Sequence, residues 1–492
     1  MTLTKNVAIW MEAITQATMH GKLQCVFAND ERVINGCFAI YALVADCAAG
    51  KIHQFGLLTE DEKFPSLTPL IPSAAWYERE IHDLFGLQPL EHPDLKPLII
   101  HAGMTGDFPM RKDAVTCVCN EYHSPQPNNL PENLFEVPVG PIHAGIIEPG
   151  HFRFTQDGED IVKLDATLFF THRGIEKTLE GKHFDQAYFS ATRICGACTV
   201  SHALSYSQAV EQAANCAISS RAKYLRIFVA ELERLYNHIG DIGNLCAGCG
   251  FAVAVSAGAR MKEALLRQNE QLTGSRWLRD YIRPGGVAFD IPDDDLKEVV
   301  FAIEDIFEDF CELTELLDDR PAFLNRVEST GVLAKTVAER LGAVGVAARA
   351  SGIAEDSRTD FPYSGYGELE FDVVCEQAGD AAARMKVRIN EVWNSVNILR
   401  QIVELISPVG EPLCAIGEIA PYTQAFAWSE SARGMNIHWL MFGENNTIFR
   451  CFVRSASYAN WPIVPYCVSG DIIADFPIVN KSFELCYACI DR

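Results

Sequence analysis

Two C-x-x-C pairs are the strongest candidates for chemistry in this sequence. One is Cys195-Gly-Ala-Cys198 and the other is Cys486-Tyr-Ala-Cys489. The i,i+3 spacing lets both thiols of a pair face one point. If the two pairs converge, four thiolates form a soft site that suits nickel, iron or zinc. A bound metal would keep those thiols deprotonated.

The other cysteine patterns give weaker signals. Structural zinc usually holds two C-x-x-C pairs separated by tens of residues, whereas Cys198 and Cys486 lie much further apart. A third pair, at residues 246 and 249, lies in an apolar, glycine-rich stretch and is interpreted as packing. Cys117 and Cys119 form a C-x-C pattern that suggests ligation only weakly.

Composition limits the class of protein and its partners. The net charge is −24, and no cluster of Lys and Arg offers a site for phosphates, so nucleic acid is not an expected partner. The 17 cysteines, with no N-terminal signal segment, indicate a reducing, cytoplasmic environment. The apolar residues 242–259 are interrupted by Asn244, Ser256 and several glycines. We expect a buried, closely packed helix there, not a membrane span.

The elements that must position these residues fall into two domains of an α+β protein. Residues 1–121 mix strand-like runs at 33–45 and 52–58 with a helical stretch at 76–85, which predicts an α/β domain. Residues 122–138 are rich in Pro, Asn and Glu and read as a linker. Residues 139–492 are predicted to form a mostly helical domain with small edge sheets.

Apolar periodicity supports this division. Residues 139–168 suggest a small sheet, and the last 80 residues return to mixed, aromatic-rich structure. Apolar residues recur at three-four spacing in the stretches that we predict as long helices: 221–242, 296–317 and 381–406.

Four motifs, in order, resemble [NiFe] hydrogenase large subunits. The segment Arg193-Ile-Cys-Gly-Ala-Cys198, followed by His202, resembles the N-terminal metal motif of that family, and Cys486-Tyr-Ala-Cys489, followed by Arg492, resembles the C-terminal one. The segment His172-Arg-Gly-Ile-Glu176-Lys resembles the part that carries the family's proton-transfer glutamate, and Ser431-Ala-Arg433-Gly resembles the part that carries an arginine over the metals.

Most of the remaining chain resembles subunits of respiratory complex I. The 30-kDa-type subunit is matched by residues 76–86, 92–95 and 108–113. The 49-kDa-type subunit is matched by residues 140–143, 231–238, 350–352 and 356–358. A fusion of both modules that keeps four metal cysteines resembles the large subunits of group 4 membrane-bound [NiFe] hydrogenases of the formate hydrogenlyase type.

Two features of the C-terminal motif affect this comparison. Glu484-Leu485 stands where the family often has Asp-Pro, which predicts a different local turn with the same ligands. The ending at Arg492 resembles the form that the family reaches after a C-terminal extension is removed.

The resemblance implies a metal group and its ligands. Cys195 and Cys486 would be terminal nickel ligands, and Cys198 and Cys489 would bridge nickel to an iron that carries CO and two cyanides. A magnesium ion is a further candidate cofactor. Such an enzyme would reduce protons to H2 reversibly.

The resemblance also gives roles to nearby side chains, each with a plainer alternative. Glu176 would take protons from the Cys486 thiolate, with a pKa raised by burial, or it would form a salt bridge with Lys177 or Arg173. Arg433 would donate to an iron-bound cyanide or help to polarise hydrogen, or form a structural ion pair. His202 would hydrogen-bond a bridging sulfur, or be an ordinary core residue.

Electrons must leave through other chains, because the sequence has no G-x-G-x-x-G after a strand and no further set of four close cysteines. The resemblance implies an iron–sulfur small subunit like the 20-kDa-type subunit of complex I, ferredoxin-like subunits, membrane subunits and a formate dehydrogenase. The chain would lie in the cytoplasm, peripheral on the inner face of the membrane. The rival hypotheses are a metal-free complex I-type scaffold and a zinc-stabilised assembly protein, and nickel content separates all three.

Overall fold

The N-terminal part of the chain is built on a four-stranded sheet. The computed structural model describes residues 2–121, 130–145, 147–406 and 409–492. The sheet has the order β1-β4-β3-β2, in which β1 runs parallel to β4 and the other pairs are antiparallel. Its strands and the helices around it are β1 (Thr2–Thr4), α1 (Val7–His20), β2 (Lys22–Glu31), α2 (Arg32–Asn35), β3 (Cys37–Asp46), β4 (Lys51–Thr59) and α3 (Ala75–Phe85). The strands and helix expected at residues 33–45, 52–58 and 76–85 correspond to β3, β4 and α3.

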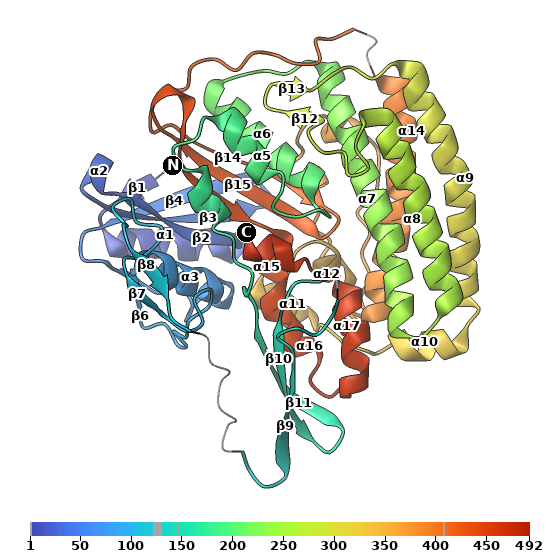
Figure 1. Cartoon of the computed structure of the whole chain (residues 1–492), viewed down its shortest axis with the longest axis horizontal. Coiled ribbons are helices and arrows are strands. Elements are labelled where there is room, and N and C mark those ends of the chain that lie inside the picture. The colour runs from blue at the N-terminus through green and yellow to red at the C-terminus, as the bar shows by residue number, and fades with distance from the viewer. Residues whose placement is uncertain (1, 122–129, 146, 407–408) are drawn as a thin grey trace.

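Short strand pairs and a protruding antiparallel sheet follow. The pairs are β5 (Lys63–Pro65) with β6 (Gln88–Leu90), and β7 (Met104–Gly106) with β8 (Cys117–Cys119). The protruding sheet contains β9 (Leu134–Val139), β10 (His151–Asp157) and β11 (Asp160–Thr167), in the order β11-β10-β9 (Figure 1). Part of the expected linker, residues 122–129, lies outside the described residues. The end of that linker is already strand β9, because Val137 and its neighbours pair with β10.

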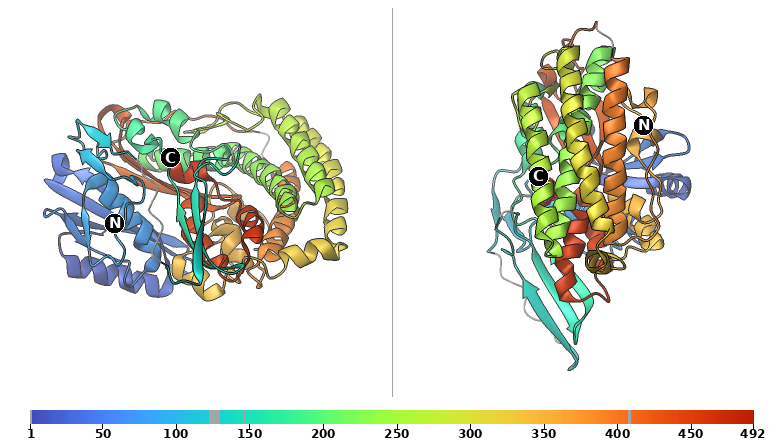
Figure 2. Two further views of the ribbon diagram at one scale, coloured as in Figure 1. Left: turned by 60° about the horizontal axis from the view of Figure 1, so that its bottom comes forward. Right: turned by 90° about the vertical axis from the view of Figure 1, so that its right-hand side faces the viewer.

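Four long helices form a bundle on one side of the molecule: α7 (Ser220–Gly248), α8 (Ala252–Thr273), α9 (Asp293–Asp318) and α14 (Ala381–Leu405). They stand side by side in the right-hand view of Figure 2. Ser219 begins α7 by accepting a hydrogen bond from the Ala222 amide, and three aspartates in the first turn of α9 favour its positive end. Short helices connect this bundle to the rest: α4 (Ile175–Leu179), α5 (Phe184–Ala191), α6 (Thr199–Ala214), α10 (Pro321–Val327), α11 (Lys335–Leu341), α12 (Gly345–Ala350) and α13 (Ser357–Asp360).

The single helix expected over residues 242–259 is wrong, although the close packing expected there is present. The chain turns between α7 and α8, where Gly250 has a φ of 71°. The two helices then pack so closely that a Cβ on Gly243 would lie 3.1 Å from the Cα of Gly258. The apolar, small-residue composition therefore serves a helix–helix crossing. None of the described helices combines the length and apolarity that a membrane span requires.

The C-terminal sheet lies between the N-terminal domain and α6. Its strands are β14 (Gln424–Ser431), β15 (Gly434–Phe442) and β16 (Ile448–Arg454), and short helices α15 (Ala456–Asn460), α16 (Val464–Cys467), α17 (Phe476–Phe483) and α18 (Tyr487–Asp491) follow. Phe27 of β2 stacks on Phe452 at 4.3 Å and contacts Trp439 at 5.0 Å. One hydrophobic core therefore runs from the N-terminal sheet into this C-terminal sheet.

Candidate metal centre

Four cysteine sulfur atoms from two distant segments converge in the interior. The sulfurs of Cys195, Cys198, Cys486 and Cys489 all lie within 4.8 Å of one another. Cys486 is half-buried and the other three are buried. Within the described part of the chain, this is the one group of at least three His, Cys, Asp or Glu side chains close enough to share an ion. Four thiols at this spacing fit a thiophilic metal group.

Each cysteine pair occupies the start of a helix. Cys198 precedes α6, and Cys195 lies in the turn before it. Cys486 precedes α18, and Cys489 lies within that helix. The i,i+3 spacing therefore places both thiols of a pair on the same side of a helical turn, as the sequence predicts.

Arg173 joins the two cysteine segments. Its Nη2 atom donates to the carbonyl of Ile194 at 2.7 Å and to the carbonyl of Ala488 at 2.9 Å. Asn237 of α7 donates to the Ala197 carbonyl at 2.8 Å. Because these donors hold the backbone of both C-x-x-C motifs, the thiol cluster depends on side chains outside it. Sequence reasoning gave Arg173 a different partner and did not identify Asn237.

The thiols of the cluster differ in pKa. Hydrogen bonds within the cluster, with that to Cys195 the largest cause, raise the pKa of Cys198 and Cys489 well above the usual range, although the bond to Cys489 acts in the opposite direction on Cys198. The same contacts hold the pKa of Cys486 well below its usual range, and the positive charge of Arg433 acts in the same direction. A bound cation would favour the thiolate form of all four, which is the requirement of a metal ligand.

His202 lies against the cluster on α6. Its Nε2 atom is 3.6 Å from the sulfur of Cys489, and the residue is fully buried. Burial lowers the pKa of His202 to about 4, so its imidazole is neutral at pH 7. The imidazole tautomer and the protonation of Cys489 decide which of the two atoms donates. If Cys489 were a metal-bound thiolate, His202 protonated on Nε2 would be the donor.

Arg433 lies in the turn between β14 and β15, where its charge faces the sulfurs of Cys486 and Cys198. Asp241 of α7 accepts from both terminal nitrogens of Arg433, at 2.8 and 3.0 Å. The Nε atom donates to the carbonyl of Glu484 at 2.9 Å. A guanidinium has five N–H groups, so two remain for a group bound at the centre. The ion pair with Asp241 therefore leaves Arg433 able to donate to a group bound at the centre.

Glu176 is buried between two arginines that the sequence did not suggest. It accepts from Arg450 at 2.7 Å, from Arg492 at 3.0 Å and from the Val453 amide at 2.9 Å. The expected salt bridges with Lys177 or Arg173 are wrong, because Lys177 pairs with Glu180 and Arg173 holds the cysteine segments.

The expected direction of the Glu176 pKa is also wrong. Burial alone raises the pKa of this carboxyl, but Arg492 and Arg450 lower it, and the net shift is downward. The arginines overcome burial because opposite charges in contact stabilise the ionised carboxylate.

Comparison with known proteins agrees with this geometry. The family model described as "Nickel-dependent hydrogenase" matches residues 173–248. The models for the respiratory-chain NADH dehydrogenase 30 Kd and 49 Kd subunits match residues 5–117 and residues 249–416 with 412–492.

Relatives that match nearly the whole chain show the family to which it belongs. Formate hydrogenlyase subunit 5 of Escherichia coli is 33% identical over 96% of this chain and 85% of its own length. Hydrogenase-4 component G of the same organism is 33% identical over 96% of this chain and 84% of its own length. The chain belongs to the family of these hydrogenase large subunits. NADH-quinone oxidoreductase subunit 4 of Thermus thermophilus is 29% identical over 72% of this chain and 93% of its own length.

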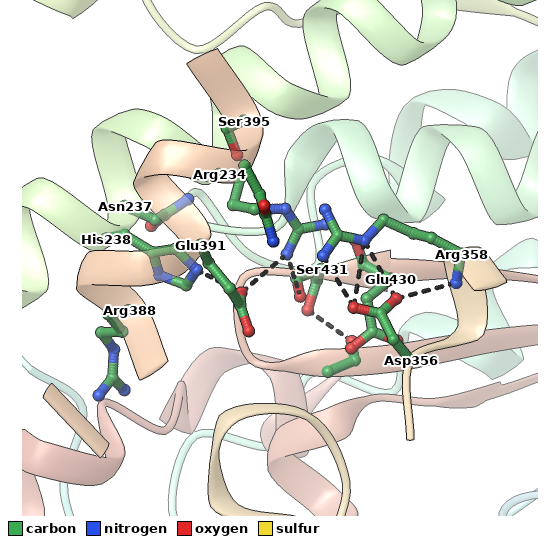
Figure 3. A network of polar contacts seen from close by, with 12 residues as sticks. Arg234, Asn237, His238, Asp356, Arg358, Arg388, Glu391, Ser395, Glu430 and Ser431 are labelled. Atoms are coloured by element: carbon green, nitrogen blue, oxygen red, sulfur yellow. Dashed lines mark hydrogen bonds and ion pairs between the residues drawn. The ribbon is translucent and has the colours of Figure 1, made fainter. Parts of the chain in front are cut away.

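In this member of the hydrogenase large-subunit family, a buried network of charges supports the Arg433 turn (Figure 3). Arg234 of α7 donates to the carbonyls of Glu430 and Ser431 at 2.7 and 3.2 Å. Beside it, His238 lies 2.8 Å from Glu391, which also pairs with Arg349 at 2.7 Å. Because these buried groups of opposite charge contact one another, they hold the turn in one position.

The segment before Cys486 is held in the same way. Arg388 of α14 donates to the carbonyls of Ser482 and Phe483 at 2.7 and 3.1 Å. Glu484 ends α17 in a left-handed conformation with a φ of 49°. Glu484-Leu485 thus falls on a helix end. The change of local turn relative to the family stays a prediction.

The remaining cysteine patterns lie apart from the centre. Cys246 is buried at the end of α7 and Cys249 is half-buried in the following turn. Cys117 and Cys119 are exposed on β8. Neither pair belongs to the group of four sulfurs.

Proposed function

We propose that this chain is the catalytic large subunit of a [NiFe] hydrogenase that reduces protons to H2 reversibly within a formate hydrogenlyase-type complex. The observation that carries the proposal is the buried convergence of four thiols from two distant segments. It is supported by the family membership and by Arg433 and His202 beside the same cysteines. Glu176 adds to this support, because it pairs with Arg492, three residues after Cys489.

In this proposal Cys195, Cys198, Cys486 and Cys489 would hold the nickel–iron group. When bound, the group supplies the redox chemistry of splitting or forming H2, and its iron carries CO and two cyanides. A magnesium ion is part of the same proposal. The protein contributes a buried site, fixed ligands and positioned proton groups.

Three side chains handle charge at the centre. Cys486, the least buried of the four cysteines, favours the thiolate form and would act as the base that takes up a proton and hands it on toward Glu176. Arg433, fixed by Asp241, keeps two N–H groups for cyanide nitrogen. His202 donates from Nε2 to the sulfur of Cys489, which fixes the orientation of that ligand.

The partners belong to the proposal as well. The relatives that match most of the chain are named as subunits or components, which supports a multisubunit assembly. We propose an iron–sulfur small subunit resembling the 20-kDa-type subunit of complex I, ferredoxin-like subunits and membrane subunits, with formate dehydrogenase as the electron source. Through them the chain would lie on the cytoplasmic face of the membrane.

A metal-free complex I-type scaffold is the second candidate, favoured by the matches to the 30 Kd and 49 Kd subunit models over much of the chain. An infrared spectrum of the purified complex, taken with a nickel and iron assay, separates the two. Bands of metal-bound CO and cyanide with about one nickel per chain are expected for the hydrogenase. Absence of both the bands and nickel would leave the scaffold as the better account.

A further inference from the structure

A carboxylate from the N-terminal domain reaches the ion-pair group around Glu176. Glu80 of α3 forms an ion pair with Arg492 Nη2, while Arg492 Nη1 donates to Glu176 at 3.0 Å. Glu80 and Glu176 are each 6% exposed and Arg492 is 2% exposed. The two carboxylates, one from each domain, therefore both pair with the same buried guanidinium.

The charges of this group balance only when Glu80 is counted. Arg450 and Arg492 carry two positive charges, and Glu176 alone supplies one negative charge. Glu80 supplies the second. Without it, Glu176 would face an excess positive charge, which makes the neutral, protonated form of its carboxyl harder to reach.

The N-terminal domain is fixed firmly enough to place Glu80 there. Arg454 of β16 donates through Nε to the carbonyl of Gln24 at 3.1 Å, and Lys177 donates to the carbonyl of Arg111 at 3.0 Å. The stacking of Phe27 on Phe452 continues the same interface. A side chain on a helix held by such contacts is positioned with little freedom.

We propose that Glu80 is a positioning residue for proton transfer through Glu176, an inference that rests on the hydrogenase function proposed above. By sharing Arg492, Glu80 leaves that guanidinium with a partner whenever Glu176 takes up a proton. Glu176 therefore takes up a proton more readily than it would if the two arginines faced it alone. The N-terminal domain is thus part of the proton machinery.

The charged and titratable neighbours of Glu176 come from four parts of the chain. Burial raises the pKa of Glu80, and Glu176 raises it further, whereas Arg492 lowers it, with a net upward shift. The titratable and charged groups that face Glu176 are Arg450 and Cys451 of β16, Arg492 at the end of α18, Glu80 of α3 and His172 before α4.

The test compares E80Q, E80D and E355Q in the purified complex. Glu355 forms an ion pair with Lys22 at 2.6 Å, so E355Q removes a different charge pair between the same domains. For each variant we would measure nickel content, the infrared bands of CO and cyanide, and the infrared titration of buried carboxyl groups. The pH dependence of hydrogen–deuterium exchange between H2 and D2O completes the set, with E176Q identifying the Glu176 band.

The expected result is specific to the charge of Glu80. E80Q keeps its nickel and metal bands, but the Glu176 carboxyl titrates about one pH unit lower and the exchange profile shifts to lower pH by a similar amount. E80D, which retains the charge, stays near the wild type, and E355Q does not change the profile.

Two results would overturn the proposal. One is an E80Q protein with full nickel whose carboxyl titration and exchange profile coincide with those of the wild type. The other is loss of nickel in both E80Q and E80D, which would show that Glu80 has a structural role. A wild-type complex without CO and cyanide bands would instead refute the hydrogenase function, while the carboxyl titration would still report on the coupling of Glu80 and Glu176.

Discussion

Replacing Asp241 by Asn is expected to loosen the turn that carries Arg433. Asp241 accepts two hydrogen bonds from Arg433 and lies 3.4 Å from Arg388, so its carboxylate neutralises two buried guanidiniums. Asn keeps the shape but removes the charge. The β14–β15 turn then keeps only the Arg234 hydrogen bonds to α7, and Arg433 is left buried with an uncompensated charge.

The size of this effect follows from the pKa of Asp241. Burial raises that pKa, but Arg433, His238 and Arg388 lower it from 3.8 to about 2. The pKa is depressed on folding, so the stabilisation is complete above pH 3.8 and is lost as the pH falls toward 2. At pH 7 the shift corresponds to about 2 kcal/mol, or roughly a 30-fold change in the local opening equilibrium.

Hydrogen–deuterium exchange of the intact complex measures that opening directly. The Arg433 amide donates to the Ser431 hydroxyl at 3.1 Å, so peptides covering residues 431–436 report on the turn. In D241N at pH 7 their exchange should accelerate roughly 30-fold. D290N is the matched control, because Asp290 pairs with Arg221 near the surface and its side chain is 45% exposed. Exchange in D241N within about threefold of the wild type would refute the argument that Asp241 fixes Arg433.

Three further results are expected. C198S should lose nickel and iron in a metal assay, whereas C249S, whose thiol is outside the cluster, should keep both; equal metal content in the two would exclude Cys198 as a ligand. E176Q should keep its metals but lose at least about tenfold in exchange between H2 and D2O, because its amide cannot carry the proton; an unchanged rate would remove Glu176 from the route. Glu233 of α7 accepts from the amides of Val200 and Ser201 at the start of α6, at 2.6 and 3.0 Å. Burial raises the pKa of Glu233 to about 8, so its folded form retains a proton and the start of α6 is destabilised as the pH rises from 4.5 to 8. Exchange at residues 199–204 should accelerate over that range in the wild type and not in E233Q, and identical profiles in the two would refute the assignment.

The parts of the site that could be predicted from the sequence depend on residues only a few positions apart. Two thiols three residues apart must face one way on a helical turn, so each C-x-x-C motif already specifies half of the cluster. The long helices were predictable for the same reason, since α9 and α14 repeat apolar residues every three or four positions.

The parts of the site that could not be predicted depend on contacts between residues far apart in the sequence. Glu176 meets Arg450 and Arg492, which lie 274 and 316 residues further along the chain. Nothing near Glu176 in the sequence distinguishes these arginines from the adjacent Arg173 and Lys177. Because burial and opposite charge shift a carboxyl pKa in opposite directions, the sign of the Glu176 shift was set by partners that only the fold reveals.

Contacts between residues far apart in the sequence also tie the N-terminal domain to the rest of the protein more closely than its sequence suggests. Its composition and strand pattern mark it as a separate unit, yet Phe27 packs on Phe452 and Glu80 pairs with Arg492. A buried carboxylate is retained at an interface only with a compensating partner, and that partner here also holds Glu176. Removing the N-terminal domain would therefore expose apolar core and also leave Arg492 with one carboxylate instead of two. Loss of that domain should change the protonation of Glu176 even in a variant whose cysteines remain in place.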